Sequence, residues 1–166
     1  MGEPDSQPTS PIDRAHVEEF WRQFLTEADM AEDTTFVEAF QLGSGAAMAD
    51  ELVDLIVNGP KRATAGSVAD YEADGDAYPE VGDYWVACGG DGRARAILCT
   101  TDVRIGPLSS VDDQFAWDEG EGDRTRADWL RMHTAFFAKG HARIGAKMHA
   151  DIPVVFERFA VAYTDE

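Results

Sequence analysis

The stretch YWVACGGDGRARAILCTTDV, residues 84–103, decides the class of fold that this sequence predicts. Residues 84–88 are aromatic or apolar, as in a β-strand, and residues 93–103 alternate between polar and apolar side chains. Between them, the run Gly89-Gly90-Asp91-Gly92 is the strongest turn signal in the chain. We therefore predict a β-hairpin over residues 84–103.

Helical and strand-like segments are grouped around this hairpin rather than strictly alternating. Apolar spacing and capping residues predict a first helix that begins at Ser10-Pro11, with an apolar stripe of Val17, Phe20, Trp21, Phe24 and Leu25, and then a short strand or extended segment over residues 34–40. A second helix, with Met48, Leu52, Leu55 and Ile56 on one face, is expected to end at residues 58–60 and to be followed by a polar loop over residues 61–67. After the hairpin we expect a short helix over residues 109–116, a flexible acidic loop over residues 119–123, a helix around residues 129–137 that closes at Gly140, and a strand over residues 153–163. This grouping predicts an α+β fold with a mainly antiparallel, barrel-like sheet and flanking helices.

The length of 166 residues is that of one ordinary domain, which we expect over residues 11–166. Residues 1–10 contain no aromatic side chain and are expected to be a disordered tail. They have no apolar core of a secretory signal, and no window approaches the roughly 18 to 20 apolar residues of a membrane-spanning helix. Cys88 and Cys99 are too few for a disulfide framework. We therefore expect a cytoplasmic protein with reduced thiols and no membrane partner.

The charge is strongly negative, with 14 basic and 32 acidic residues and a net charge of −18. Such a field repels polyanions, so no duplex-DNA partner is expected. The charge is uneven, because residues 1–60 have a net charge of −11 and residues 129–166 a net charge of +1. A small nucleic-acid ligand therefore remains compatible with the composition, and the sequence does not indicate an oligomeric state.

Several common catalytic motifs are absent from the sequence. It contains no dinucleotide-binding GxGxxG at the start of a helix, no P-loop, no HExxH and no CxxC. Its four histidines, at positions 16, 133, 141 and 149, have no recognisable metal-ligand spacing. We expect neither a cofactor nor a metal.

The segment Gly59-Pro60-Lys61-Arg62-Ala63-Thr64 has two interpretations from its residues alone. It can be a solvated loop, with a lysine favoured by the C-terminal end of the preceding helix. Alternatively, its small neighbours leave room for a ligand. Lys61 would then neutralise an anion, or act as a base if burial lowers its pKa.

The spacing Gly59-x-Lys61-x-x-Thr64 resembles the GxKxxT signature of the ASCH domain family. Further features follow in the order expected for the larger bacterial subfamily, and the resemblance covers roughly residues 30–164. They are Tyr71-Glu72, Gly82-Asp83 before a strand, the acidic run over residues 119–123, a helix with Trp129 and His133, and a last strand with Pro153-Val154-Val155 and Glu157-Arg158-Phe159. The resemblance implies a PUA-like β-barrel with flanking helices.

The resemblance to this family implies a function related to RNA. Its members are regarded as RNA-binding modules, and they include a small bacterial acetylcytidine amidohydrolase and a ribonuclease. In the amidohydrolase, the lysine and threonine of the motif act with a later glutamate. These resemble Lys61, Thr64 and Glu121 here, with Glu119 as the other candidate for the acid. That enzyme has an arginine two positions after the threonine, whereas this chain has Gly66.

The chemistry of such a site leaves two schemes open. A threonine hydroxyl needs a base within about 3 Å to become a nucleophile. Either Glu121 takes the proton while the Lys61 ammonium stabilises the oxyanion, or Lys61 is the base and the glutamate orients the nucleophile or protonates the leaving amine. Neither scheme requires a metal.

The remaining candidates form a predicted ligand-binding set. Its members are Gly59, Arg62, Ser67, Tyr71, Glu119, Asp123, Trp129 and His133. Each has a structural alternative, since acidic loops are usually solvated and a Trp–His pair four residues apart is common in a helix core. Arg93 and Arg95 share a strand face that could contact phosphate, although a solvated edge explains them equally simply.

The leading function hypothesis is therefore binding of a nucleoside or short single-stranded RNA, with hydrolysis of an acylated base as its most concrete version. The alternatives are a non-catalytic RNA-binding module and a metal-independent ribonuclease.

Overall fold

The computed structural model describes residues 7–165, so residues 1–6 of the expected disordered tail lie outside the described residues. Residues 7–10 have no regular secondary structure, but their backbone is hydrogen-bonded. The Ser10 N–H donates to the Gly90 carbonyl at 2.8 Å, and the Gln7 carbonyl accepts from the Ala46 N–H at 2.8 Å. This part of the tail therefore has defined backbone partners.

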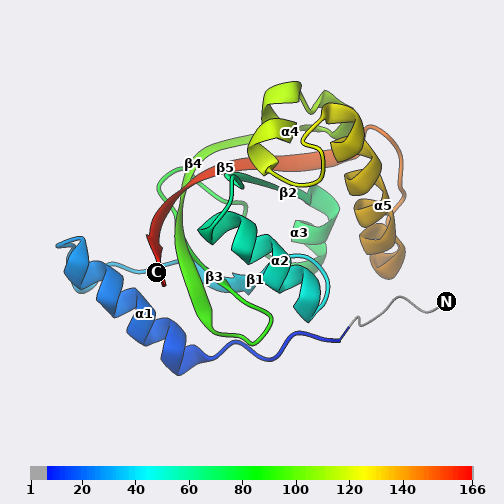
Figure 1. The fold of residues 1–166 in the computed structure, drawn as a ribbon. Coiled ribbons are helices and arrows are strands. Elements are labelled where there is room, and N and C mark those ends of the chain that lie inside the picture. Colours follow the sequence, from blue (N-terminus) through cyan, green and yellow to red (C-terminus); the bar gives the residue numbers. More distant parts are fainter. Residues whose placement is uncertain (1–6, 166) are drawn as a thin grey trace. The chain divides into compact units, whose positions relative to one another are not determined.

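The chain contains both helices and strands, as predicted (Figure 1). In order they are α1 (Arg14–Glu27), β1 (Glu38–Gln41), α2 (Ala46–Val57), β2 (Ala63–Ser67), α3 (Val68–Asp74), β3 (Tyr84–Cys88), β4 (Ala94–Pro107), the 3-10 helix η1 (Leu108–Ser110), α4 (Asp113–Glu119), α5 (Arg126–Ile144) and β5 (Pro153–Thr164). The strands are hydrogen-bonded in the order β1-β3-β4-β5-β2. The pair β1–β3 is parallel, whereas β3–β4 and β2–β5 are antiparallel, which confirms the α+β class.

The chain divides into two compact units. The first unit comprises residues 1–59, 82–99 and 160–166, and the second comprises residues 60–81 and 100–159. Both β4 and β5 contribute residues to each unit. The single domain expected from the sequence stays a prediction.

The first unit contains the predicted hairpin and the stripe of α1. Strands β3 and β4 pair from Tyr84↔Cys99 to Cys88↔Ala94, with an irregularity at residues 87–88. The whole predicted stripe of α1 is buried, in one cluster with Ala39, Val86 and Ile97. In α2 the buried face is rotated from the prediction. Its buried residues are Ala49, Leu52, Val53 and Ile56, and Met48 is exposed.

The start of α1 was predicted wrongly. The helix begins at Arg14, and the Asp13 carboxylate caps it by accepting from the His16 N–H at 3.0 Å. Ser10 does not cap a helix, because the backbone before α1 is hydrogen-bonded to the hairpin turn instead. The Asp13 N–H donates to the Gly92 carbonyl at 2.9 Å. Contacts with the turn therefore override the local Ser-Pro capping signal.

The core of the second unit is formed by two helices and two strands. Phe115 of α4 and Trp129 of α5 pack in one cluster with Ala63 of β2 and Phe156 of β5. The Phe115 and Phe156 rings meet edge to face, with centroids 5.1 Å apart. This cluster fixes the ends of α4, α5 and β2 beside one another.

Residues 63–67 form strand β2, where the sequence predicted a polar loop. They pair with β5 from Ala63↔Arg158 to Ser67↔Val154, and both Ala63 and Ser67 are buried. A run this small and polar has no strand propensity of its own, but β5 provides its hydrogen-bond partners. Tertiary pairing therefore decides the structure of this segment.

Two helix boundaries in the second unit also differ from the predictions. The short helix predicted over residues 109–116 is α4, which begins at Asp113 and runs to Glu119, so the predicted acidic loop begins inside a helix. Helix α5 continues through Gly140 to Ile144 and ends at Gly145, which has a left-handed φ of 70°. A glycine inside a helix costs only about 1 kcal/mol, which tertiary packing readily offsets.

Within residues 7–165, none of the helices combines the length and apolar character needed to cross a bilayer.

Gly120 provides a test of how α4 is joined to the segment before β2. Its φ is +71°, and a Cβ there would lie 2.9 Å from both the N and the Cα of Lys61. Gly75 has the same φ of +71° with nothing within 4 Å of a Cβ. We expect Gly75→Ala to cost about 1–2 kcal/mol of unfolding free energy through φ alone. Gly120→Ala should cost at least about 2 kcal/mol more through the backbone clash.

The measurement is urea denaturation of the wild type and of both variants. Equal losses in the two variants would contradict the close approach of Gly120 to Lys61.

Candidate functional site

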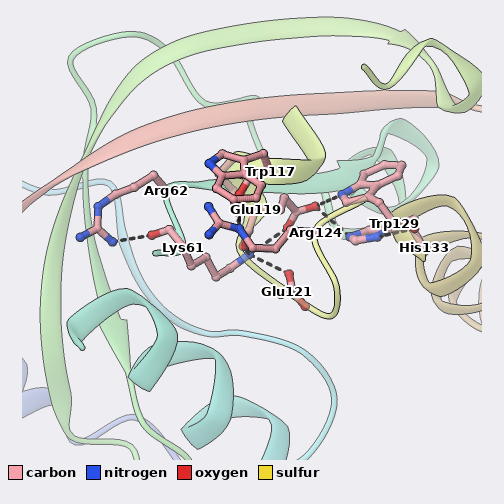
Figure 2. Close-up of polar contacts among 9 residues, drawn as sticks. Lys61, Arg62, Trp117, Glu119, Glu121, Arg124, Trp129 and His133 are labelled. Carbon is pink, nitrogen blue, oxygen red and sulfur yellow. Dashed lines mark hydrogen bonds and ion pairs between the residues drawn. The ribbon is translucent and has the colours of Figure 1, made fainter. Parts of the chain in front are cut away.

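The Lys61 ammonium is the centre of a buried polar cluster in the second unit (Figure 2). Only 1% of this side chain is exposed. Its Nζ donates to Oε1 of Glu119, to Oε2 of Glu121 and to the Ala63 carbonyl, each at 2.8 Å. Three short hydrogen bonds use all three protons of the ammonium.

The end of α4 brings the two glutamates to the lysine. Glu119 is the last residue of the helix, and Gly120 follows in the left-handed conformation. The turn reverses the chain, so that Glu119 and Glu121 reach the same ammonium from two sides. The Arg62 N–H donates to the Asp118 carbonyl at 2.7 Å, and this hydrogen bond joins the residue before β2 to the end of α4.

The second oxygen of Glu119 is bound by two residues of α5. Its Oε2 accepts a hydrogen bond from the indole Nε1 of Trp129 and lies 2.9 Å from Nε2 of His133. The two rings are one helical turn apart and stack with centroids 3.9 Å apart. Glu119 is therefore held at both carboxylate oxygens.

The hydrogen bonds of His133 define its protonation. Its Nδ1 lies 2.9 Å from the Trp129 carbonyl, and its Nε2 faces the Glu119 carboxylate. A carbonyl and a carboxylate both accept protons, so only the doubly protonated imidazolium donates to both. Burial lowers the pKa of His133, but the hydrogen bond and charge of Glu119 outweigh burial and raise it above its ordinary value. The ring is therefore a cation beside Glu119.

The two glutamates differ in their acidity. Burial opposes ionisation of Glu119, but the charge of Lys61 and the His133 hydrogen bond prevail and lower its pKa. For Glu121, burial and the charge of Glu119 prevail over Lys61 and raise its pKa. The Glu121 side chain is 21% exposed, against 1% for Glu119. Glu121 is thus the acid of this cluster that reaches solvent and takes up a proton more readily.

The environment of Lys61 bears on the two schemes left open by the sequence. Burial lowers its pKa, but the two carboxylates outweigh burial and raise it. A lysine held as the ammonium is a poor general base. Lys61 in this state is therefore unsuited to be the base of the second scheme.

The same cluster has the composition of a metal site but is already occupied by cations. Glu119, Glu121 and His133 offer ligand atoms that lie within 4.8 Å of one another. The Lys61 ammonium, however, already binds both carboxylates, each at 2.8 Å. A protonated His133 has no lone pair for a metal. These residues therefore fit an ion-pair network better than a metal centre.

Thr64 is a predicted catalytic residue that the structure does not join to this cluster. No hydrogen bond among the described residues connects its hydroxyl with Lys61 or Glu121. Thr64 lies in β2 directly opposite Glu157 of β5, so the two side chains share one face of the sheet. Ala63 and Ala65 occupy the alternate positions and pack in the core with Trp129. The strand alternation therefore separates Thr64 from the residues that face this core.

Glu157 is a buried acid that the sequence predictions missed. It is 8% exposed, and its Oε2 accepts from the Thr100 hydroxyl at 2.7 Å. An acidic residue at an inward position of the apolar strand PVVFERFAVAY was the signal that could have identified it. It is the carboxylate that the strand register places beside Thr64.

Tyr71 and Gly66 are packed against each other. A Cβ at Gly66 would lie 2.9 Å from Cε2 of the Tyr71 ring. The ring therefore takes the space that a larger side chain at position 66 would need. Tyr71 is half-buried, and burial, followed by the charges of Glu157 and Asp76, raises its pKa to about 12.

Several members of the predicted ligand-binding set have structural roles. Ser67 is fully buried, caps α3 by accepting from the Asp70 N–H, and lies 3.0 Å from Nε2 of His141. Trp129 is buried in the core, which leaves its ring no free face for a ligand. The Asp123 carboxylate accepts from the Thr125 N–H and hydroxyl before α5. These side chains are therefore engaged in holding the fold.

Two further members lie at the entrance to β2. Arg62 is exposed, and its guanidinium donates to the Lys61 carbonyl at 2.6 Å. Gly59 belongs to the first unit, where a Cβ would lie 2.9 Å from the Leu55 carbonyl oxygen. Glycine is thus required there by the end of α2.

The arginines and cysteines of the first unit agree with the simpler interpretations. Arg95 forms an ion pair with Asp165 at 2.8 Å, and Arg93 lies 3.8 Å from Asp13. Cys88 and Cys99 are free thiols. Burial raises the pKa of Cys88 to about 12, which leaves it unreactive.

Trp117 and Arg124 were also missed by the sequence predictions. Trp117 is 54% exposed although its neighbours Phe115 and Ala116 are buried. The Arg124 guanidinium lies over the indole, 3.6 Å from the ring centroid. An aromatic residue on the polar side of a short helix was the available signal.

Comparisons with known proteins agree with this fold. A model of the ASCH domain family matches residues 38–163. The crystal structure of a DUF984-family protein from Enterococcus faecalis is 30% identical, has a TM-score of 0.81, and is matched over 89% of this chain and 88% of that chain. An ASCH domain from Lactobacillus crispatus is 29% identical with a TM-score of 0.81, over 90% of this chain and 95% of that chain. No curated protein matches the sequence. The likeness confirms the predicted PUA-like fold.

The ion cluster predicts a large effect of removing its central charge. Lys61→Met leaves the buried Glu119 carboxylate without its main counter-ion, so the free energy of unfolding should fall by about 3–5 kcal/mol at pH 7. Lys147→Met, at an exposed lysine, should change it by less than about 0.5 kcal/mol. The double variant Lys61→Met/Glu119→Gln should recover part of the loss. Urea denaturation checks this, and a Lys61→Met protein as stable as the wild type would disprove the network.

His133 predicts a dependence of stability on pH. Because its pKa is raised from 6.5 on folding, the folded protein binds more protons than the unfolded chain above that pH. The stabilisation is complete below pH 6.5 and is lost as the pH rises through the folded pKa, by up to about 1.4 kcal/mol per pH unit. His133→Gln should lack this slope. The measurement is urea denaturation at pH 5.5–9, and equal slopes for both proteins would rule out the imidazolium.

Proposed function

Because the chain belongs to the ASCH domain family, we propose that it binds a nucleoside or a short single-stranded RNA through its second unit, beside Glu121. The PUA-like fold is consistent with RNA binding. The net charge of −18 favours a small ligand over a long strand, since many phosphates would be repelled. The proposal therefore concerns recognition of a base rather than neutralisation of a backbone.

The observation that carries this proposal is the unequal pair of glutamates at Lys61. Glu119 is enclosed and bound at both oxygens, whereas Glu121 is partly exposed with a raised pKa. A carboxylate at this position accepts a hydrogen bond from the exocyclic amine of a cytosine-type base. Its raised pKa also suits it to exchange a proton with a reacting group. Glu121 is thus suited to both recognition and proton transfer.

The most concrete version of the function is hydrolysis of an acylated cytosine-type base. The similarity of Lys61, Thr64 and Glu121 to residues of the family's acetylcytidine amidohydrolase, like the assignment to the larger bacterial subfamily, remains a prediction and names the first substrate to try. In this reaction the nucleophile, Thr64 or a water molecule, bonds to the acyl carbon as the amide C–N bond breaks. Glu121 accepts the proton of the nucleophile and returns it to the leaving amine.

A threonine pathway has a further requirement. It forms an acyl ester that water must cleave to release the carboxylic acid and restore the hydroxyl. The carboxylate nearest to Thr64 along the strand pair is Glu157, not Glu121. Substitutions at Thr64 and at Glu121 therefore separate the two nucleophiles, because the water pathway needs only Glu121.

A second candidate function, a non-catalytic RNA-binding module, is favoured by a different observation. The three hydrogen bonds of the Lys61 ammonium are all used within the protein. The ammonium can bind an oxyanion only if one of these bonds breaks. Such a module would bind an oligoribonucleotide with strong salt dependence and release no product.

Acetylcytidine turnover tests the catalytic proposal. Glu121→Gln should lower kcat/KM by about 100-fold to 10,000-fold, because the amide cannot accept the proton. Asp123→Asn removes the same charge from the same loop and should change kcat/KM by less than about threefold, since this side chain only caps a turn. Turnover that survives Glu121→Gln would contradict the mechanism. Loss of turnover in Thr64→Ala would assign the nucleophile to Thr64.

The same proteins distinguish the alternatives on unmodified RNA. An oligoribonucleotide that binds and remains intact indicates the non-catalytic module. Cleavage that persists in the presence of a chelator indicates a metal-independent ribonuclease.

A further inference from the structure

An exposed tryptophan lies within the segment that forms the Lys61 cluster. Trp117 is two residues before Glu119 in α4, and 54% of it is exposed. Its helix is anchored, because Phe115 and Ala116 are buried in the core of the second unit. A ring of this size would stabilise the fold if it were buried, and on the surface it does not contribute this free energy. The position therefore points to a use at the surface.

Arg124 holds the ring in a defined orientation. Its guanidinium lies 3.6 Å from the centroid of the Trp117 ring, and its Nε donates to the Trp117 carbonyl at 2.9 Å. Figure 2 shows the guanidinium and the indole together. One face of the ring is therefore covered by a planar cation, yet more than half of the residue remains accessible.

The backbone of Arg124 is in a conformation that is unfavourable for its residue type. Its φ is 65°, in the left-handed region that favours glycine. Gly120 and Gly122 adopt the same region, with φ of 71° and 61°. A glycine at position 124 would avoid the strain but would remove the guanidinium from the indole. The loop thus keeps a strained arginine where its side chain covers Trp117.

The ring and the reactive carboxylate belong to one short segment. Residues 118–123 connect Trp117 with Arg124 and include Glu121, and the Arg124 N–H donates to the Glu121 carbonyl at 3.2 Å. We propose that the Trp117 ring, backed by Arg124, is a stacking platform for a nucleobase that places the exocyclic groups of the base toward Glu121. This subsite rests on the proposed function and specifies its ligand as a base.

The surroundings of the ring favour a nucleobase over other occupants. A planar base stacks on an indole whatever its sequence context, and loss of one such contact weakens binding by about 5- to 150-fold. Asp113, Asp118 and Asp123 lie within the same 12 residues as Trp117 and Arg124, so an anionic membrane surface or a run of phosphates would be repelled. A neutral flat base with a donor amine matches an aromatic ring and a carboxylate that belong to the same short segment.

The test is binding of cytidine and of N4-acetylcytidine by calorimetry. Trp117→Ala should weaken binding by about 10- to 100-fold, whereas Trp117→Phe, which keeps a ring, should lose less than about fivefold. Phe136→Ala is the matched control, because Phe136 is an aromatic residue of the same unit that is 42% exposed. It should leave the affinity unchanged.

Arg124 is tested by two substitutions that separate charge from strain. Arg124→Gly should weaken cytidine binding several-fold while the thermal midpoint stays the same or rises, because glycine relieves the left-handed φ. Arg124→Lys keeps the charge but not the planar group and should recover only part of the affinity.

The results distinguish this subsite from the proposed function. Wild-type binding that is weakened by Glu121→Gln but unchanged in Trp117→Ala, or weakened equally in Phe136→Ala, overturns the platform and leaves the proposed function standing. Binding that depends on Trp117 but not on Glu121 supports the platform and removes the proposed role of Glu121. A wild-type protein that binds neither probe overturns both.

Discussion

The second unit depends on one buried ammonium group. Lys61 is enclosed by protein, and its charge is tolerable there only because two carboxylates and a carbonyl surround it. Removing such a charge from water costs several kcal/mol, which the paired acids must offset. The lysine therefore dictates that the end of α4 and the entrance to β2 stay together. It also dictates the ionisation of every group that contacts it.

The same constraint divides two acids that are chemically identical in the sequence. Glu119 faces α5, where the Trp129 indole and the His133 ring bind its second oxygen. Glu121 lies beyond a glycine turn and meets only the outer side of the ammonium, where solvent reaches it. One carboxylate is consequently a fixed counter-ion, and the other can change its protonation. The exposed carboxylate is thus held in place through a buried neighbour that stays ionised.

Much of the fold followed from local pattern, and the failures have identifiable causes. The hairpin, the stripe of α1 and strand β5 were predicted because each has strong periodicity of its own. Strand β2 was missed because its small residues become a strand only when β5 pairs with them. The start of α1 was misplaced because the hairpin turn binds the backbone of residues 10–13. Glu157 and Trp117 were overlooked because each contradicts the pattern of its own element, an acid facing inward and a tryptophan facing outward.

The sequence by itself determined which residue types are available for chemistry and the α+β class, which follow from composition and periodicity, properties of neighbours along the chain. The pairing of Lys61 with the acidic run over residues 119–123 was implied only by the resemblance to the ASCH domain family. Only the tertiary structure decided that Lys61 is fully enclosed, that Glu119 and not Glu121 is the fixed partner, and that Thr64 lies opposite Glu157. Burial and strand register depend on contacts between segments distant in sequence, and those contacts set each pKa and the face on which each side chain lies.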